Sequence, residues 1–361
     1  MAAGSPEALP AYESLIAGRR AGVWAGLQRA ALSVLSAGYR CGIGIRNAWY
    51  DYGVGVRSLP VPVISVGNLT VGGTGKTPMT LWLCEQLRRE GRKPAVLSRG
   101  YRAAPGTPPD ELAMLTHRCP QAVFVAHPDR LRSGLLAIES HGADVLVLDD
   151  GFQHRRVARD LEIVLIDATC PFGYGHVLPR GLLREPLSSL RRANVLVVTR
   201  ADQVSAGELD ALCRTLAKQA LDCPILRCVH RPAGFTSLDG EPVESPAPSR
   251  RVGLFAGIAR PAAFEQTIAG LGLSAVPLRW YRDHHAYAPE DVAELAALAR
   301  QQDVECLVTT EKDAVKLVPL TTTWPCPVCV VRVDVDFLGG DDTILARSVR
   351  GAINEVEGSD G

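Results

Sequence analysis

The sequence predicts an α/β fold with a doubly wound, mostly parallel sheet, a second, smaller α/β domain and an N-terminal amphipathic helix. Short apolar runs alternate with helical patterns along most of the chain. These runs lack polar alternation, which is typical of strands that are buried on both faces of a parallel sheet. Strands are expected at 61–67, 94–98, 122–126, 144–149, 161–167 and 194–199, and helices at 77–90 and 128–141.

A second observation divides the chain. Proline and glycine crowd together between residues 225 and 250, which indicates a domain boundary or hinge. Beyond it, strands are expected near 251–256, 275–279, 305–310 and 328–334, and helices near 261–271 and 289–302. We therefore predict an N-terminal helical segment at 1–57, a main domain at 58–225 and a smaller C-terminal domain at 226–361.

Residues 61–78 join an apolar strand, a glycine-rich turn and the start of a helix. Glycines let successive backbone N–H groups converge on an anion, and the helix N-terminus adds its unpaired N–H groups and positive dipole end. The residues that would hold the phosphates are Gly72, Gly73, Thr74, Gly75, Lys76 and Thr77. The Lys76 amine would reach the β- and γ-phosphates, and the Thr77 hydroxyl would ligate Mg²⁺.

One residue departs from this motif. The eight-residue P-loop pattern requires glycine at position 70, where this chain has Thr70. Gly72 and Gly73 would supply the backbone flexibility instead. The alternative is an ordinary glycine-rich turn between a strand and a helix. We interpret the segment as the P-loop of a nucleoside triphosphate-binding domain, which makes the fold P-loop NTPase-like.

The composition is that of a globular protein with a sizeable core. The chain has 361 residues, 47% of them hydrophobic, and a net charge of zero, which disfavours a general nucleic-acid binder. Ten cysteines lie mostly in apolar contexts, as expected of reduced thiols. Cys326 and Cys329 form the only CxxC pair, and without a second pair nearby we interpret it as part of a strand. Nothing in the sequence indicates an obligate protein partner.

Residues 22–37 are apolar but interrupted by Arg29. On a helix, Trp24, Leu27 and Leu35 share one face, while Arg29 and Arg40 lie opposite. The short length and the central arginine argue against a spanning helix or a signal peptide. The apolar face would lie in a bilayer interface or pack on the protein itself. Residues 1–60 hold six arginines and three acidic residues. The aromatic rings that follow the helix favour the first alternative, in which the apolar face lies in a bilayer interface.

The apolar strand at 144–149 ends in Asp149, and Asp150 follows. The carboxyl ends of parallel strands face the crevice in which phosphoryl transfer takes place. One carboxylate would therefore hold Mg²⁺, and its neighbour would bind a second metal ion or orient a nucleophile. The alternative is a turn-forming pair of aspartates ahead of a glycine.

Two further loops carry charged groups. Arg184 could neutralise charge on the γ-phosphate and Glu185 could assist the metal, although the two could also form a surface ion pair. In the segment 283–285, two adjacent histidines rarely serve one metal ion, whereas Asp-His can act as an oriented proton acceptor. A purely structural role is the alternative for this segment.

Six segments in a fixed order carry a resemblance to a known family: residues 66–78, 98–101, 149–154, 178–186, 283–285 and 310–313. From about residue 20 to 320, the chain closely resembles the tetraacyldisaccharide 4′-kinases, the lipid A 4′-kinases of Gram-negative bacteria. The resemblance implies a kinase that uses ATP and Mg²⁺ to phosphorylate the 4′-hydroxyl of a tetraacylated glucosamine disaccharide 1-phosphate. It places the enzyme at the cytoplasmic face of the inner membrane, with the N-terminal helix as the anchor.

The resemblance also implies the catalytic groups. In that family, a carboxylate from a Gly-Asp-Glu-Pro segment is thought to work with the Asp-His motif to deprotonate the sugar hydroxyl. The matching segment here is Pro109-Asp110-Glu111-Leu112, in which the flanking glycine and proline are replaced. Asp110 would be the general base and His284 its partner, beside Lys76 and Asp150 at the phosphates.

Two other classes remain open on the residues alone. The segment 199–202, Thr-Arg-Ala-Asp, faintly resembles the guanine-reading motif of P-loop GTPases, although arginine replaces lysine and the Asp-x-x-Gly switch is missing. A membrane-bound partitioning-type ATPase would use the same anchor and P-loop but leave lipid unphosphorylated. Nucleotide preference and a phosphorylated lipid product separate the three classes.

Overall fold

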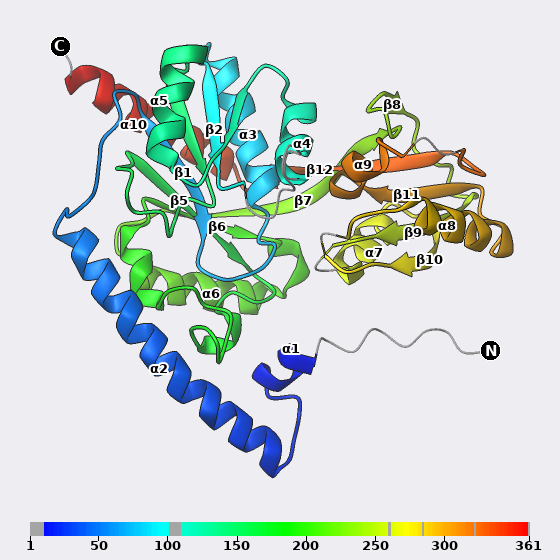
Figure 1. The fold of residues 1–361 in the computed structure, drawn as a ribbon, viewed down its shortest axis with the longest axis horizontal. Helices are drawn as coiled ribbons and strands as arrows, with labels where there is room; N and C mark the ends of the chain where they lie inside the picture. Colours follow the sequence, from blue (N-terminus) through cyan, green and yellow to red (C-terminus); the bar gives the residue numbers. More distant parts are fainter. Residues whose placement is uncertain (1–10, 101–109, 259–260, 284, 321–322, 360–361) are drawn as a thin grey trace. The chain divides into compact units, whose positions relative to one another are not determined.

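The computed structural model describes residues 11–100, 110–258, 261–283, 285–320 and 323–359 (Figure 1). The chain divides into two compact units, each assembled from separate stretches. The first unit takes the chain up to residue 76, residues 150–228 and those from 338 onward, and the second takes residues 77–149 and 229–337. The continuous domains at 58–225 and 226–361 stay a prediction from the sequence.

Parallel strands form the centre of the first unit. Strand β1 (Val63–Asn68) pairs with β5 (Leu161–Asp167), β5 with β6 (Val195–Thr199), and β6 with the first residues of β7 (Ile225–Thr236). Every residue of β1, β5 and β6 is buried. Burial on both faces explains why these strands show no polar alternation in the sequence.

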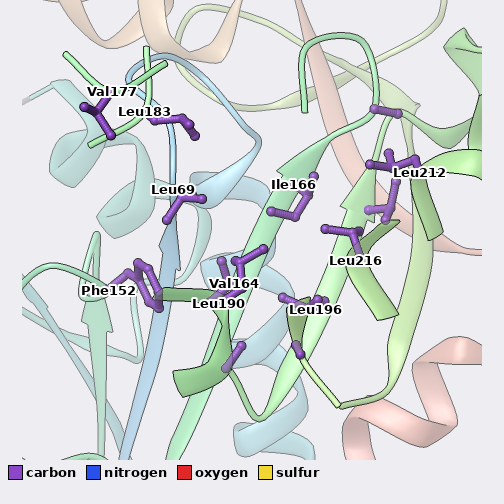
Figure 2. Close-up of a cluster of buried hydrophobic side chains, with 14 residues drawn as sticks. Leu69, Phe152, Val164, Ile166, Val177, Leu183, Leu190, Leu196, Leu212 and Leu216 are labelled. Carbon is purple, nitrogen blue, oxygen red and sulfur yellow. The ribbon is translucent and has the colours of Figure 1, made fainter. Parts of the chain in front are cut away.

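Helices and a buried cluster complete the first unit. The helices are α1 (Ala11–Ile16), α2 (Val23–Asp51), α6 (Ala206–Gln219) and α10 (Asp341–Ser359), with 3-10 turns η1 (Gly173–Gly175), η2 (Leu187–Arg192) and η3 (Ala201–Gln203). Leu212 and Leu216 of α6 join Val164 of β5 and Leu196 of β6 in a hydrophobic cluster (Figure 2). This cluster packs α6 against β5 and β6.

The end of β1 packs closely on the segment that follows Asp150. A Cβ atom on Gly67 would lie 2.6 Å from the backbone nitrogen of Phe152, so the strand can approach that segment only with glycine here. Phe152 is itself fully buried and belongs to the same hydrophobic cluster. The close approach therefore holds the chain after Asp150 against the strand that leads into the P-loop.

The second unit contains two sets of parallel strands. In the first set, β2 (Pro94–Ser98) pairs with both β4 (Val145–Asp149) and β3 (Val123–Ala126). In the second, β9 (Arg251–Ala256) pairs with β10 (Ser274–Trp280) and β11 (Cys306–Thr310), and β11 pairs with β12 (Val328–Phe337). The short β8 (Pro242–Val243) is antiparallel to β7.

The remaining helices are α3 (Lys76–Arg89), α4 (Asp110–Arg118), α5 (Arg130–His141), α7 (Pro261–Ala269), α8 (Pro289–Gln301) and α9 (Glu311–Leu317). Helix α5 contacts β2 and β3, and α4 contacts α9. The predicted fold class is confirmed, because the strand pairs above are parallel apart from β7–β8 and helices alternate with them.

The observed element boundaries mostly agree with those expected from the sequence. The named strands and the helices after residue 60 lie within three residues of their expected bounds. Three differences stand out: α2 continues to Asp51, the segment expected to loosen after 225 contains β7, and helices α4, α6, α9 and α10 were not expected. A capping box formed by Ser205 and Glu208 was an available signal for α6.

Helix α2 has two different faces. Its large exposed apolar side chains are Val23, Trp24, Leu27, Val34, Leu35, Ile45 and Trp49. At about 100° per residue, these side chains fall within an arc of roughly 120°. No described helix is both long and apolar enough to span a bilayer.

The other face of α2 contacts the rest of the first unit. Ser36 donates to the Val177 carbonyl at 2.9 Å, and Tyr39 donates to the Arg184 carbonyl at 3.0 Å. Tyr50 lies beneath Arg155, whose guanidinium carbon is 5.5 Å from the ring centroid. Of the aromatic side chains in α2 and at its C-cap, Trp49 and Tyr52 are exposed, whereas Tyr39, in the middle of the helix, packs against the hydrophobic cluster.

Candidate nucleotide-binding site

The loop between β1 and α3 has the geometry of a phosphate cradle. Gly72 and Gly75 adopt φ angles of 122° and 90°, which side chains disfavour, so glycine is needed at both positions. Thr70, which replaces the expected glycine, forms a bridge with Leu183, and the Val71 N–H donates to the Leu182 carbonyl at 2.8 Å. The first half of the loop is therefore extended, a conformation in which threonine is well tolerated.

The Thr74 hydroxyl provides a test of whether this loop suits a phosphate group. The side chain is buried, and its Oγ1 atom has no hydrogen-bond partner among the described residues. A buried hydroxyl without a partner is costly unless a ligand accepts from it or donates to it. The loop that starts α3 thus offers a hydroxyl, backbone N–H groups and a helix N-terminus, and this donor set fits a polyphosphate.

Lys76 lies beside Asp150, one of the two aspartates predicted to lie near the phosphates. Its Nζ atom lies 3.5 Å from Asp150 Oδ1 and donates to Asn68 Oδ1 at 3.3 Å. Asn68 is the last residue of β1, and its amide donates to the Thr70 carbonyl at 2.8 Å. The lysine is therefore held at the mouth of the loop, where phosphates would bind.

Asp150 is also contacted by a second cation. Arg184 Nη1 donates to both carboxylate oxygens of Asp150, at 2.9 and 2.8 Å, and to Gln153 Oε1 at 3.1 Å. Burial raises the pKa of Asp150, but Lys76 and Arg184 outweigh it, so the pKa lies below its ordinary value. Two cations and an ionised carboxylate therefore meet at this point.

The position of Arg184 is set by the backbone around it. Its N–H donates to the Leu69 carbonyl at 2.8 Å, while its own carbonyl accepts from Tyr39 of α2. The loop containing Arg184 is thus bonded both to the P-loop strand and to the N-terminal helix. This is how the fold brings residues more than a hundred positions apart in the sequence to one anion site.

Asp149 belongs to the second unit. The residue ends β4 and is buried, and its Oδ1 accepts from Thr80 of α3 at 3.4 Å. Arg130 donates to its carbonyl at 3.4 Å. Thr77 lies one helical turn before Thr80 on the same helix and is half-buried. The end of β4 therefore contacts α3 one helical turn after Thr77, and a Mg²⁺ site that includes Thr77 and Asp149 requires this proximity.

Glu185 has different surroundings from those expected of a metal ligand. It is fully buried, and its Oε2 accepts from Asn47 at 2.8 Å and from Arg192 at 2.9 Å. Burial lowers the pKa of the Arg192 guanidinium, while Glu185 opposes this shift. A buried carboxylate with these partners favours a structural role, tying α2 to η2, over the expected assistance to the metal.

The two proposed proton-transfer residues lie at the limit of what the structure describes. Asp110 is the first residue of α4, but its side chain is outside the described part of the chain, and so is the whole of His284. The segments around His284 do come together. Lys312 contacts Asp283 at 3.1 Å, and His285 contacts Asp291 at 3.0 Å.

Asp313 lies at the centre of the contacts around the segments 283–285 and 310–313. Its Oδ2 accepts from the Gly257 N–H at 3.0 Å and from Thr310 Oγ1 at 2.7 Å, and it is fully buried. A Cβ on Gly257 would lie 3.1 Å from Asp313 Oδ1 and 3.2 Å from the Arg282 carbonyl, which ties the 310–313 and 283–285 segments together. Gly257 was not recognised in the sequence, because a single glycine after a strand is a weak signal.

Three other residues of the site were also absent from the predicted set: Asn68, Gln153 and Arg200. Asn68 and Arg200 hold P-loop atoms, and Gln153 donates to the Asn68 carbonyl at 2.9 Å. Asn68 ends β1 and Arg200 follows β6, so each lies where strands of a parallel sheet present ligand-binding groups. Polar residues at strand ends were therefore the available signal.

Together, the cradle, Lys76, Asp150 and Arg184, all in the first unit, define a P-loop protein that binds a nucleoside triphosphate. The family model described as Tetraacyldisaccharide-1-P 4'-kinase, LpxK, matches residues 28–353. The chain belongs to this family.

Relatives named tetraacyldisaccharide 4'-kinase support this assignment. One from Anaeromyxobacter sp. (strain Fw109-5) is 40% identical over 313 residues, covering 81% of this chain and 83% of the relative. One from Syntrophus aciditrophicus is 39% identical and covers 84% and 88%. The crystal structure of LpxK from Aquifex aeolicus in complex with ATP has a TM-score of 0.71 and 28% identity, covering 90% of this chain and 99% of that one. The GTPase and partitioning ATPase alternatives have less support.

Proposed function

We propose that this protein transfers the γ-phosphate of ATP to the 4′-hydroxyl of a tetraacylated glucosamine disaccharide 1-phosphate. The observation that carries the proposal is the contact of Lys76 with Asp150, 3.5 Å apart, beside Arg184 at the P-loop. Membership of the tetraacyldisaccharide-1-P 4'-kinase family supplies the acceptor.

The proposed roles at the phosphates follow from charge. The backbone N–H groups from residue 72 to 77 surround the triphosphate, and Lys76 binds the β- and γ-phosphates. Arg184 stabilises negative charge on the transferred group, because it already binds an anionic oxygen at this place. Phosphoryl transfer passes through a loose transition state, so positioning and charge neutralisation account for most of the rate.

The proposed metal is Mg²⁺, held by the Thr77 hydroxyl and by Asp149 and Asp150. Mg²⁺ prefers hard oxygen ligands and is commonly bound by one or two carboxylates together with substrate phosphates. Bound there, Mg²⁺ would neutralise charge on the β- and γ-phosphates. The residues fit this group, since Asp149 contacts α3 through Thr80 and Asp150 is ionised.

The proposed base is Asp110, with His284 as its partner. A carboxylate near the acceptor hydroxyl takes its proton as the phosphoryl group arrives, and the histidine orients or shares that proton. The support is the matching segment at 109–112 and the Asp-His motif at 283–284.

We also propose that the protein binds the cytoplasmic face of the bacterial inner membrane through α2. The apolar face of α2 is exposed rather than packed on the rest of the first unit, with Trp24 81% and Trp49 60% exposed. An amphipathic helix with such a face lies in the headgroup region, where indole rings are favoured. A lipid acceptor requires the site to be near that surface.

The experiment that tests the function is transfer of label. Purified protein is incubated with γ-labelled ATP, Mg²⁺ and the lipid disaccharide 1-phosphate, and the lipid product is analysed for label at the 4′ position. Label on the sugar with wild-type protein, and none with Lys76→Met, is the expected result. Label that appears only as free phosphate, or transfer from GTP in preference to ATP, would contradict the proposal.

A further inference from the structure

Thr199, the last residue of β6, and Arg200, the next residue, hold two successive carbonyl groups of the P-loop. Thr199 Oγ1 donates to the Thr74 carbonyl at 3.0 Å, and Arg200 Nη2 donates to the Gly73 carbonyl at 2.9 Å. All four residues lie in the first unit. The apex of the loop is therefore fixed from the side of β6 by side chains.

Arg200 is itself held rigidly. Its Nη1 is paired with the carboxylate of Asp167, and the two side chains are 12% and 2% exposed. Asp167 ends β5 and also accepts from the N–H and hydroxyl of Thr169, at 2.9 and 2.7 Å. The guanidinium thus connects a buried carboxylate at the end of one strand to a backbone oxygen of the P-loop.

The direction of these bonds matters for anion binding. In a trans peptide, the C=O of one residue and the N–H of the next point in opposite directions. Holding the Gly73 and Thr74 carbonyls toward β6 therefore points the N–H groups of Thr74 and Gly75 away from β6. Those N–H groups belong to the part of the loop that would surround a phosphate.

We infer that Thr199 and Arg200 are positioning residues, which preorganise the P-loop N–H groups for the triphosphate. The inference rests on the proposed phosphate-binding role of the loop. It also gives the segment 199–202 a function unlike that of a guanine reader, because Arg200 contacts loop backbone and Asp167. In this role each residue acts through the loop carbonyl that it holds, and not by binding a phosphate itself.

The test is direct binding of Mg²⁺-ATP by calorimetry, together with steady-state kinetics. Arg200→Gln removes a charge-assisted bond and is expected to raise the Kd for ATP by roughly 10- to 100-fold. Thr199→Val removes the donor with little change of shape, and is expected to weaken binding by roughly 10-fold. Thr199→Ser keeps the hydroxyl and is expected to bind ATP as the wild type does. In both weakened variants KM for ATP rises, while kcat at saturating ATP changes little.

A matched control lies at the opposite end of β5. Arg159 donates to Glu162 at 2.8 Å, and these side chains are 14% and 2% exposed, so the pair has nearly the same burial as Arg200–Asp167. Arg159→Gln is expected to lower Tm without changing the Kd for ATP. Unchanged ATP binding in Arg200→Gln, equal weakening in Arg159→Gln, or failure of Thr199→Ser to retain affinity would overturn the inference. A wild-type protein that does not bind ATP would instead overturn the proposed function, and this inference with it.

Discussion

The amine of Lys76 lies 3.5 Å from the carboxylate of Asp150, although β1 and β4, which lead to these residues, are separated by some eighty residues of sequence. The same carboxylate accepts two bonds from Arg184. Both cations are thus already directed at an anion at the mouth of the P-loop. A triphosphate bound there would replace part of this carboxylate contact with phosphate oxygens.

Replacement of Lys76 by methionine is expected to reduce turnover by at least about 1,000-fold, because the charge that meets the β- and γ-phosphates is lost. The side chain keeps a similar length and apolar stem, so the fold should be retained. Label transfer from ATP to lipid and circular dichroism check the two points. Lys93→Met, at an exposed lysine directly before β2, serves as the control. Turnover near the wild-type rate in Lys76→Met would show that the P-loop is not the phosphate site.

Asp150 gives a pH-dependent prediction for stability. Its pKa in the folded protein lies below its unfolded value of 3.8, because Lys76 and Arg184 outweigh the effect of burial. The stabilisation is therefore present above about pH 4 and is lost as the pH falls through the folded pKa. The Tm of the wild type should exceed that of Asp150→Asn at pH 6, and the difference should shrink below pH 4. A constant difference between pH 7 and pH 3 would contradict the ionised assignment.

A substitution of Glu185 distinguishes a structural role of this residue from a role in metal binding. Loss of its negative charge leaves the Arg192 guanidinium, which is mostly buried, without a counter-charge, so Glu185→Gln should lower the free energy of unfolding by about 3 kcal/mol. The Mg²⁺ concentration needed for half-maximal activity should not change. Urea unfolding and a Mg²⁺ titration of label transfer measure the two quantities. A raised Mg²⁺ requirement at normal stability would restore Glu185 as a metal ligand.

The proposed general base, Asp110, and its partner His284 are expected to affect turnover but not ATP binding. Asp110→Asn and His284→Ala should each lower kcat by roughly 100- to 10,000-fold, because a base acts after ATP has bound. The Kd for ATP should stay at the wild-type value. Residues that act as a unit are non-additive, so the double variant should be little slower than the slower single variant. Additive losses, or an unchanged kcat in Asp110→Asn, would remove Asp110 from the mechanism.

The exposed face of α2 predicts membrane binding. Trp24→Glu and Leu27→Glu place charges on the apolar face, and they should release most of the protein from vesicles containing anionic lipid, while ATP binding is retained. Point changes are preferable to deletion of residues 1–40, because Ser36 and Tyr39 hold the loop that contains Arg184. Leu221→Glu, at a side chain 80% exposed and outside α2, is the control. Unchanged sedimentation of the α2 variants with vesicles would exclude this helix as the anchor.

Much of the architecture could be read from local patterns. Continuous apolar runs such as 161–167 predicted buried parallel strands, because a strand covered on both faces has no polar side to show. The glycine-rich turn after β1 predicted the phosphate cradle, since positive φ angles at Gly72 and Gly75 need glycine. Helix α10 was not expected. Helix α2 was expected to be shorter, because small residues and glycines weaken its helical pattern.

What the sequence by itself determined was the parallel α/β class, the P-loop and the acidic strand end, because each depends on neighbouring residues whose backbone preferences suffice. Only the tertiary structure decided which distant side chains serve that loop. It turned Glu185 toward Arg192 and Asn47, and Arg200 toward the Gly73 carbonyl, although each is simply a charged residue in a loop when read in sequence. The physical reason is that a charged side chain pairs with whatever the fold brings within about 3 Å of it, and no local pattern encodes that partner.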